Sequence, residues 1–158
     1  KRASLDHLTG LIADRLIRKG WLAKEYDRQR LERIVQLLQD RLKVLTELED
    51  EHSFFFTEPI QYQPEAVAQY LRRDGIAAHL NALKIRMEDL ASFDSGTLEQ
   101  AIRALAADRH LQAKDLIHPA RVAVTGRAVS PPLFEVMSIL GKATVTKRLD
   151  YAATQLAA

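Results

Sequence analysis

The residues best suited to recognition chemistry gather in one stretch, HPARVAVTGRAVSPPLFEVMSILGK, residues 118–142. It holds three of the chain's five prolines, two glycines, and two arginines, Arg121 and Arg127. Arginine can pair bidentately with a phosphate or a base edge, and it can stack on a base. A turn shaped by glycine and proline leaves backbone groups open to a ligand, as in the reading of single-stranded RNA. The stretch is therefore either a nucleic-acid-binding corner or a plain helix–turn–helix corner with two solvated arginines.

Catalytic and metal-binding patterns are missing from the sequence. It contains no GxxxxGK[ST] phosphate loop, no GxGxxG, no GxSxG elbow and no HExxH. Its five histidines are scattered, with no pair at the spacing that lets two bind one metal. The absence of cysteine excludes a disulfide scaffold and thiolate metal sites. Taken alone, the chain is expected to be a binding module without a cofactor of its own.

Charge is distributed unevenly although the net charge is only +2. Residues 1–46 carry eleven Lys or Arg against six Asp or Glu, residues 47–58 carry five acids and no Lys or Arg, and residues 111–158 carry six bases and three acids. This layout fits either a nucleic-acid footprint at two places or an ordinary solvated surface. No stretch approaches the roughly 20 apolar residues that span a bilayer, and the first residues lack a long apolar core. We therefore expect no membrane partner and a cytoplasmic location.

Helical periodicity dominates, and six Gly and five Pro in 158 residues leave few turns. The composition suits one all-α domain or two small packed subdomains. Several helix ends are marked by capping residues. In the first half of the chain we expect helices over residues 5–19, with Gly20 as cap, from Asp27 as N-cap to about residue 50, and over residues 65–73 and 76–91. A further helix is expected from Thr97, which forms a capping box with Gln100. The last three are expected from Pro119 to Gly126, from Ser130 as N-cap to Gly141 with Pro131 at the first helical position, and over residues 146–156.

Three segments need individual interpretation. Residues 121–126, RVAVTG, favour a strand by propensity, but no second strand is available to pair with them, so a short buried helix is expected. Phe54, Phe55 and Phe56 are expected to plug the core of a first subdomain. Residues 31–48 repeat Leu, Ile and Val with a period close to 3.5, which predicts a packed helix. Arg41 lies about 60° from the middle of this apolar seam, at the border between core and solvent.

Residues 118–142, followed by TKRLDYA, resemble the C-terminal anticodon-binding region of bacterial glutamyl-tRNA synthetases. The family's pattern is a PLR[VA]ALTG run, a small or hydroxyl residue with proline, LFE, a hydrophobic helix, LGKE and RL. Upstream, LLQDRLKVLTEL followed by FFF resembles the family's segment of an arginine, a leucine-rich turn and an aromatic pair. The matching positions of the C-terminal pattern are Pro119, Arg121, Val122, Ala123, Val124, Thr125, Gly126, Ser130, Pro131, Leu133, Phe134, Glu135, Leu140, Gly141, Lys142, Arg148 and Leu149.

The resemblance implies an all-α fold of two packed helical subdomains, residues 1–63 and 64–158, that form an α-helical cage around the anticodon loop of tRNA(Glu). It also implies that Arg41 reads the third anticodon base and that the enzyme discriminates against the glutamine tRNA. Arg121 takes the place of the motif's arginine, and Ser130 and Leu133 take the places that contact the first two bases.

Arg127 and Lys142 are expected as additional RNA contacts. Ala120 and Pro132 depart from the family pattern, and Pro132 could shift the loop backbone. The family carries its chemistry in an N-terminal fold with HIGH-like and KMSKS-like signatures, and neither occurs here. We therefore expect a monomeric piece of a ligase that binds tRNA without activating glutamate, with ATP and Mg²⁺ used only by the full-length enzyme.

Two other classes of function stay open at this point. One is a DNA-binding helical domain, with LFEVMSIL as support and TKRLDYAATQL as recognition helix. The other is a non-catalytic interaction scaffold that uses the apolar seam of residues 31–48.

Overall fold

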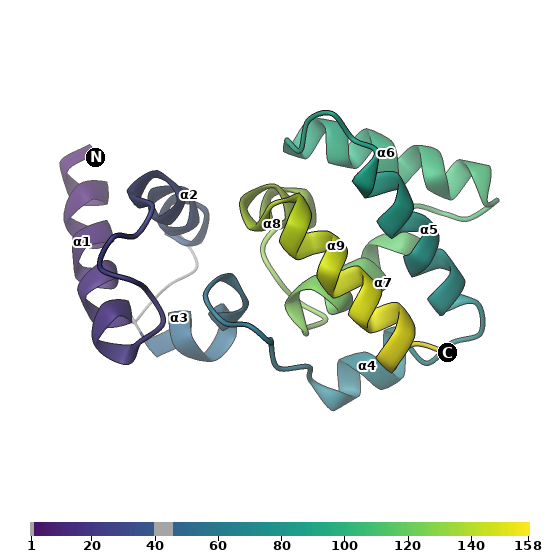
Figure 1. Ribbon diagram of the computed structural model, residues 1–158, viewed down its shortest axis with the longest axis horizontal. Helices are drawn as coiled ribbons and strands as arrows, with labels where there is room; N and C mark the ends of the chain where they lie inside the picture. Colours follow the sequence, from purple (N-terminus) through teal and green to yellow (C-terminus); the bar gives the residue numbers. More distant parts are fainter. Residues whose placement is uncertain (1, 40–45) are drawn as a thin grey trace. The chain divides into compact units, whose positions relative to one another are not determined.

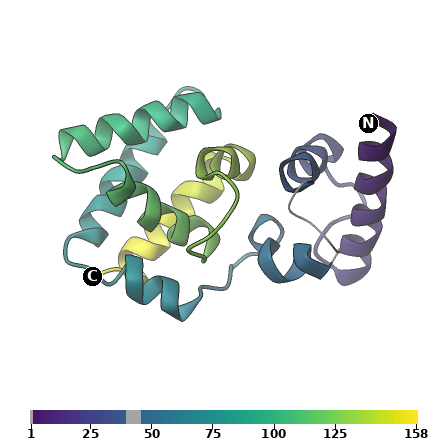
Figure 2. The same ribbon diagram turned by 180° about the vertical axis from the view of Figure 1, so that it is seen from behind.

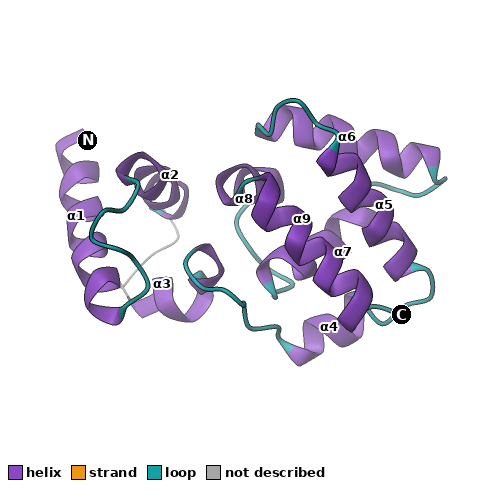
Figure 3. Cartoon of the chain, viewed as in Figure 1, coloured by secondary structure: helices purple, strands orange, loops and turns teal. Residues whose placement is uncertain are grey.

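The computed structural model describes residues 2–39 and 46–158, and over these ranges the regular structure is helical without any strand (Figures 1 and 3). The prediction of an all-α fold is confirmed. Two compact units divide the chain, Lys1–Pro59 and Ile60–Ala158, here called unit 1 and unit 2. The expected division between residues 63 and 64, with both parts serving the anticodon, stays a prediction.

Unit 1 begins with α1 (Arg2–Lys19), which packs against α2 (Arg28–Leu38). Gly20, at φ +84°, ends α1: its N–H donates to Ile17 O at 3.0 Å, and Trp21 N–H donates to Leu16 O at 2.9 Å. Asp27 caps α2 as expected, because its carboxylate accepts the Arg30 N–H at 3.1 Å. The buried apolar side chains of this unit include Leu5, Ile12, Leu16, Leu31, Ile34, Val35, Leu38 and Leu48.

The remaining elements of unit 1 are α3 (Thr46–Glu51) and the 3₁₀ turn η1 (Ser53–Phe55). The expected continuous helix from Asp27 to about residue 50 crosses residues that the structure does not describe, and Arg41 is one of them. Phe54 and Phe55 are buried with ring centroids 4.5 Å apart, which confirms the core plug for these two. Arg30 of α2 contacts this aromatic cluster, because its Nη2 donates a hydrogen bond to Phe55 O at 3.0 Å.

Unit 2 contains α4 (Pro64–Tyr70), α5 (Ile76–Glu88), α6 (Ser95–Asp108), α7 (Lys114–Thr125), α8 (Leu133–Leu140), α9 (Lys142–Tyr151) and the π-helical turn η2 (Ala152–Leu156). Both ribbon views show α9 lying alongside α5 (Figures 1 and 2). The buried side chains shared by these helices include Leu80, Leu83, Met87, Leu98, Ile102, Leu116, Val122, Val124, Val136, Met137, Val145 and Leu149.

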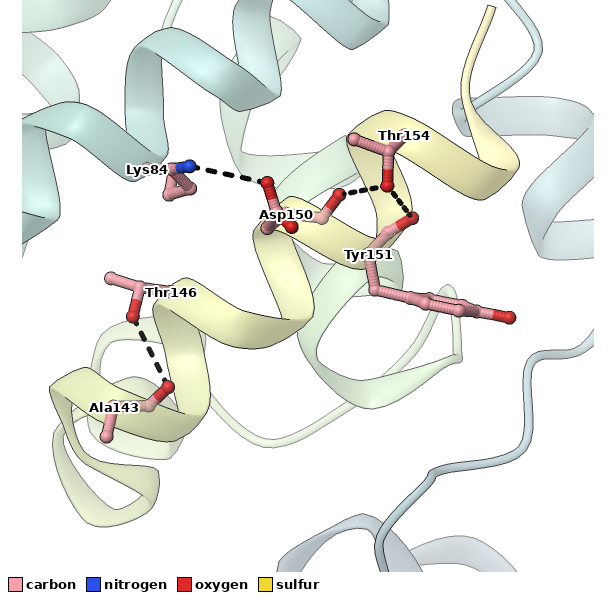
Figure 4. A network of polar contacts seen from close by, with 6 residues as sticks. All are labelled: Lys84, Ala143, Thr146, Asp150, Tyr151 and Thr154. Carbon is pink, nitrogen blue, oxygen red and sulfur yellow. Dashed lines mark hydrogen bonds and ion pairs between the residues drawn. The ribbon is translucent and has the colours of Figure 1, made fainter.

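A salt bridge joins α9 to α5, and further hydrogen bonds run along α9 and η2 themselves (Figure 4). Lys84 Nζ of α5 lies 3.3 Å from the Asp150 carboxylate of α9, and Thr154 Oγ1 donates to Asp150 O at 2.9 Å. Tyr151 points away from the helix and stacks on Tyr62 at 5.8 Å. The helix begins at Lys142, four residues before the expected residue 146, because Gly141 adopts φ +88° and lets α8 pass directly into α9.

The predicted start of α6 at Thr97 is wrong. Asp94 is the N-cap: its carboxylate accepts the Thr97 backbone N–H at 2.8 Å and the Thr97 hydroxyl at 3.0 Å. An aspartate accepts both bonds at once, so the cap lies three residues earlier than the capping-box pattern indicated. Thr97 is a capped residue rather than the capping one.

The predicted start of α7 at Pro119 is also wrong, because the helix begins at Lys114 and Pro119 is buried inside it. Proline removes the N–H that would bond the Asp115 carbonyl one turn earlier. Asp115 is an exposed residue of the first turn, so water can satisfy that carbonyl and the helix continues through the proline.

Candidate nucleic-acid interface

The recognition stretch forms a corner between α7 and α8, here called the Arg121 corner and comprising residues 121–133. Residues 121–125 are helical, and Val122, Val124 and Thr125 are buried, which confirms the short buried helix expected for RVAVTG. Gly126 ends α7 as expected, at φ +79° and ψ 5°, and its N–H donates to Val122 O at 2.8 Å. This left-handed backbone conformation favours glycine.

The chain leading into α4 is bonded to the end of α7. Gly126 O accepts the Gln63 N–H at 2.9 Å, and the Tyr62 hydroxyl donates to Ala123 O at 2.8 Å. A Cβ on Gly126 would lie 2.1 Å from Gln61 O. Glycine is therefore required at position 126 for this close approach as well as for its backbone angles.

Thr125 holds the first part of the loop. Its buried hydroxyl donates to Arg121 O at 2.7 Å and accepts the Arg127 N–H at 3.1 Å. Arg148 of α9 is also buried, and its guanidinium donates to Val124 O at 2.8 Å. The carbonyls at the end of α7 thus have defined donors, and the loop leaves the helix in one direction.

Arg121 lies half-buried in the corner, and its Nε donates to Ser130 Oγ at 3.0 Å. Ser130 Oγ in turn donates to Pro131 O at 2.7 Å. Burial lowers the pKa of Arg121, while the nearby Tyr70 acts in the opposite direction. The guanidinium still carries its charge at neutral pH, because the ordinary pKa of arginine lies far above 7. The structure therefore brings together two of the predicted residues, Arg121 and Ser130.

The expected role of Ser130 as N-cap of α8, with Pro131 as first helical residue, is wrong. The helix starts at Leu133, and its N-cap is Pro132 at φ −50° and ψ 128°. A residue that precedes proline is kept out of the helical region by contact with the proline ring, so Pro132 prevents Pro131 from starting the helix. This leaves the Ser130 hydroxyl available to orient Arg121.

Leu133 is in the predicted corner, but the residue is only 2% exposed, so its side chain lies in the core. Its N–H lies in the first turn of α8, where backbone donors have no partner within the helix. A contact at position 133 would therefore come from the backbone. The loop before it carries Val129 at 81% exposure, which sequence reasoning did not single out.

The other predicted residues have different surroundings. Arg127 is half-buried on the same loop as Arg121. Lys142 Nζ donates to Glu88 O at 3.2 Å and to Leu90 O, so its ammonium caps the C-terminus of α5. RNA contacts from Arg127 and Lys142 stay predictions, and Arg41 lies outside the described residues.

Sequence reasoning missed a pair of rings beside the corner. Tyr70 of α4 and His118 of α7 stack with centroids 5.3 Å apart and an interplanar angle of 25°. His118 lies within the recognition stretch, but nothing in the local pattern indicates that α4 brings a tyrosine against it. The two residues are 48 positions apart in sequence, so only the fold brings them together.

Among the side chains that the structure describes, no three His, Asp or Glu residues lie close enough together to hold a metal ion. A search of the same residues finds no helix that combines the length and apolarity needed to cross a bilayer.

Comparison with known proteins identifies relatives over nearly the whole chain. A family model described as the anticodon binding domain matches residues 8–153. A glutamate–tRNA ligase of Moorella thermoacetica is 35% identical over 97% of this chain and 32% of its own length. A glutamate–tRNA ligase 1 of Caldanaerobacter subterraneus subsp. tengcongensis is 31% identical over 94% of this chain and 31% of its own. The chain thus spans about a third of the length of these curated relatives.

Solved structures show the same fold. A glutamate tRNA ligase from Elizabethkingia meningosepticum, crystallised with its amino acid, matches with a TM-score of 0.86 at 18% identity, covering 97% of this chain and 30% of that one. A glutamate–tRNA synthetase from Elizabethkingia anophelis matches with a TM-score of 0.77 at 16% identity, covering 96% and 28%. The resemblance drawn from residues 118–142 is confirmed.

Proposed function

The chain belongs to the anticodon-binding domain family, and on that premise we propose that it binds the anticodon loop of tRNA(Glu) as part of a glutamate–tRNA ligase. ATP-dependent attachment of glutamate, with Mg²⁺, is then the work of the remaining two thirds of such an enzyme. These 158 residues contribute RNA recognition, as a monomer acting in the cytoplasm.

The observation that supports this role best is the bond from Arg121 Nε to Ser130 Oγ at 3.0 Å. It fixes a half-buried guanidinium whose terminal N–H groups make no hydrogen bond to the described residues. A partly desolvated, oriented guanidinium suits bidentate pairing with a base edge or a phosphate. The first-turn N–H of Leu133 offers a second donor nearby, at the positive end of the α8 dipole.

Base reading at this corner would combine these two donors. Arg121 recognises acceptor atoms on one unstacked base, and the backbone at position 133 recognises acceptors on its neighbour. Ser130 serves chiefly as the group that positions Arg121, because its hydroxyl is bonded to Arg121 Nε and to Pro131 O. Arg41 is proposed to read the third base.

Binding of an anticodon stem-loop hairpin tests this proposal directly. Arg121→Gln should weaken binding of the tRNA(Glu) hairpin by about 1–3 kcal/mol and flatten its preference over a hairpin with a swapped anticodon. Arg86→Gln is the matched control, since Arg86 pairs with Asp108 at 3.0 Å on the α5–α6 surface of the same unit. Equal affinity of the unaltered chain for both hairpins, measured by fluorescence anisotropy, would refute anticodon recognition.

The two alternative functions fit the fold less well. The solvent-facing side of α9, which a DNA recognition helix would present to the groove, carries Ala143, Lys147, Asp150 and Tyr151, so a single cation stands there beside a carboxylate. The apolar seam proposed for a scaffold is buried within unit 1 at Leu31, Ile34, Val35 and Leu38. Duplex DNA, added as a competitor in the hairpin assay, should therefore displace the RNA poorly.

A further inference from the structure

A pocket of ≈ 350 Å³ lies in unit 2, where the end of α4, the start of α5 and the first turns of α7 meet. Neither the sequence patterns nor the comparisons give it a role. Its volume falls within the range of small-ligand sites and is large enough for one nucleotide. The residues that bear on its chemistry are Tyr70, Arg73, Asp74, His79, Lys114 and His118.

Planar groups form one part of this pocket. Tyr70 and His118 stack on each other at 5.3 Å, and the Arg73 guanidinium lies 5.9 Å from the centroid of the Tyr70 ring. Aromatic rings and guanidinium planes are the surfaces on which proteins stack unpaired bases, and such stacking tolerates any base. This side of the pocket therefore suits a nucleobase.

Polar groups of both kinds line the rest. Arg73 and Lys114 are cationic, whereas Asp74 and Asp115 are carboxylates, and Asp115 also accepts the Gln112 N–H at 2.9 Å. Two carboxylates beside two cations disfavour a bare phosphate as ligand. A base edge carries donors and acceptors together, and its nucleotide adds a phosphate, so this mixed lining matches a nucleotide.

His79 contributes a fixed donor. Its Nδ1 accepts the Arg109 Nε–H at 2.8 Å, so the ring proton lies on Nε2. Burial and the charge of Arg109 lower the pKa of His79, with Asp115 acting weakly in the opposite direction, and the ring stays neutral at pH 7. A neutral Nε2–H is a donor suited to a base carbonyl or a ring nitrogen.

The pocket is next to the Arg121 corner. His118 precedes Arg121 by three residues on α7, so their side chains lie on the same helix face. Tyr70 raises the pKa of Arg121 against the larger effect of burial, in agreement with this arrangement. An RNA strand held at Arg121 would therefore run along the helix face that also carries His118 of the pocket.

We propose that this pocket holds one unstacked nucleotide that flanks the anticodon triplet, with its base against Tyr70 and His118 and its phosphate near Arg73 and Lys114. The proposal rests on the proposed function of the chain. It adds a contact outside the triplet, so that part of the affinity for tRNA would come from a loop nucleotide that is not one of the three anticodon bases.

The experiment measures binding of the 158-residue chain to anticodon stem-loop hairpins that are intact or made abasic at one loop position. His118→Ala should weaken binding of the intact hairpin by about 5- to 150-fold, the range for loss of a base–aromatic stack. It should cause no further loss with a hairpin that is abasic at one position flanking the triplet. His7→Ala, at an exposed residue of α1, is the control, and thermal melting confirms that each variant is folded.

A second variant tests the pocket in case His118→Ala disturbs folding. Lys114 is exposed, so Lys114→Gln should leave the melting temperature unchanged while lowering the salt dependence of binding by about one counterion. The same loss on every hairpin, or no loss on any, would overturn the proposal for the pocket. So would tight binding of free nucleoside monophosphates with unchanged hairpin affinity, because the pocket would then serve a free ligand.

These outcomes separate the pocket from the function of the chain. If Arg121→Gln weakens hairpin binding while His118→Ala and Lys114→Gln do not, anticodon binding stands and the pocket proposal fails. If the unaltered chain binds no hairpin, the proposed function itself fails.

Discussion

Replacement of Gly126 by alanine tests how the Arg121 corner is built. Gly126 has φ +79° and ψ 5°, and an added Cβ would lie 2.1 Å from Gln61 O. The left-handed conformation alone costs about 1–2 kcal/mol for a residue with a Cβ. The overlap must in addition push the chain before α4 off the end of α7.

That displacement breaks two bonds seen in the structure. Gln63 N–H donates to Gly126 O at 2.9 Å, and the Tyr62 hydroxyl donates to Ala123 O at 2.8 Å. Each contributes about 1 kcal/mol net. The free energy of unfolding should therefore fall by roughly 3–4 kcal/mol in Gly126→Ala.

Gly75 provides the matched control in the same unit. It has φ 86° and ψ −9°, and a Cβ there would meet only His79 Nε2, at an ordinary 3.7 Å. Gly75→Ala should lose only the conformational part, about 1–2 kcal/mol. The entropy that alanine removes from the unfolded chain is the same for both variants and cancels in their comparison.

Urea unfolding followed by circular dichroism measures both variants. The free energies of unfolding of the two variants should differ by about 2 kcal/mol, and Gly126→Ala should bind the hairpin more weakly, because the corner carries Arg121. If the two variants lose the same stability, the close approach to Gln61 contributes nothing and the argument is refuted.

Two further predictions concern helix ends in unit 2. Lys142→Met keeps the aliphatic stem but removes the donor to the Glu88 and Leu90 carbonyls. The free energy of unfolding, measured in urea, should therefore fall by about 1 kcal/mol. If stability is unchanged and hairpin binding is weaker, Lys142 contacts RNA instead. Hydrogen bonds from the Thr97 N–H and hydroxyl, and then from Ser92, lower the pKa of Asp94 in the folded chain. The ionised carboxylate therefore stabilises the fold fully above the pKa that Asp94 has in the unfolded chain. This stabilisation is lost as the pH falls through the lower pKa of the folded chain. The melting temperature of Asp94→Asn should therefore fall less than that of the unaltered chain between about pH 5 and pH 2. If the melting temperatures of both proteins fall in parallel with pH, this prediction is contradicted.

Local sequence signals predicted the helices well where one residue decides the conformation. Asp27 and Gly126 were both placed correctly, because a side-chain cap and a left-handed glycine act within a few residues. The failures at Thr97, Pro119 and Ser130 share a cause. Each residue has the right type for a helix start, but a neighbour competes for the role: Asp94 caps better, burial carries α7 through Pro119, and Pro132 excludes Pro131 from the helix.

By itself, the sequence determined the all-α class, the corner between two helices and the presence of Arg121 and Ser130 in it, whereas the bond between these two residues was seen only in the structure. Periodicity, capping and residue type act over short distances, and a motif preserves them in linear order. Only the tertiary structure decided that Leu133 turns its side chain into the core and that Lys142 caps α5. It also decided that Tyr70 lies on His118. Those relations depend on which helix faces pack together, and residues far apart along the chain meet only when their apolar faces are buried against each other.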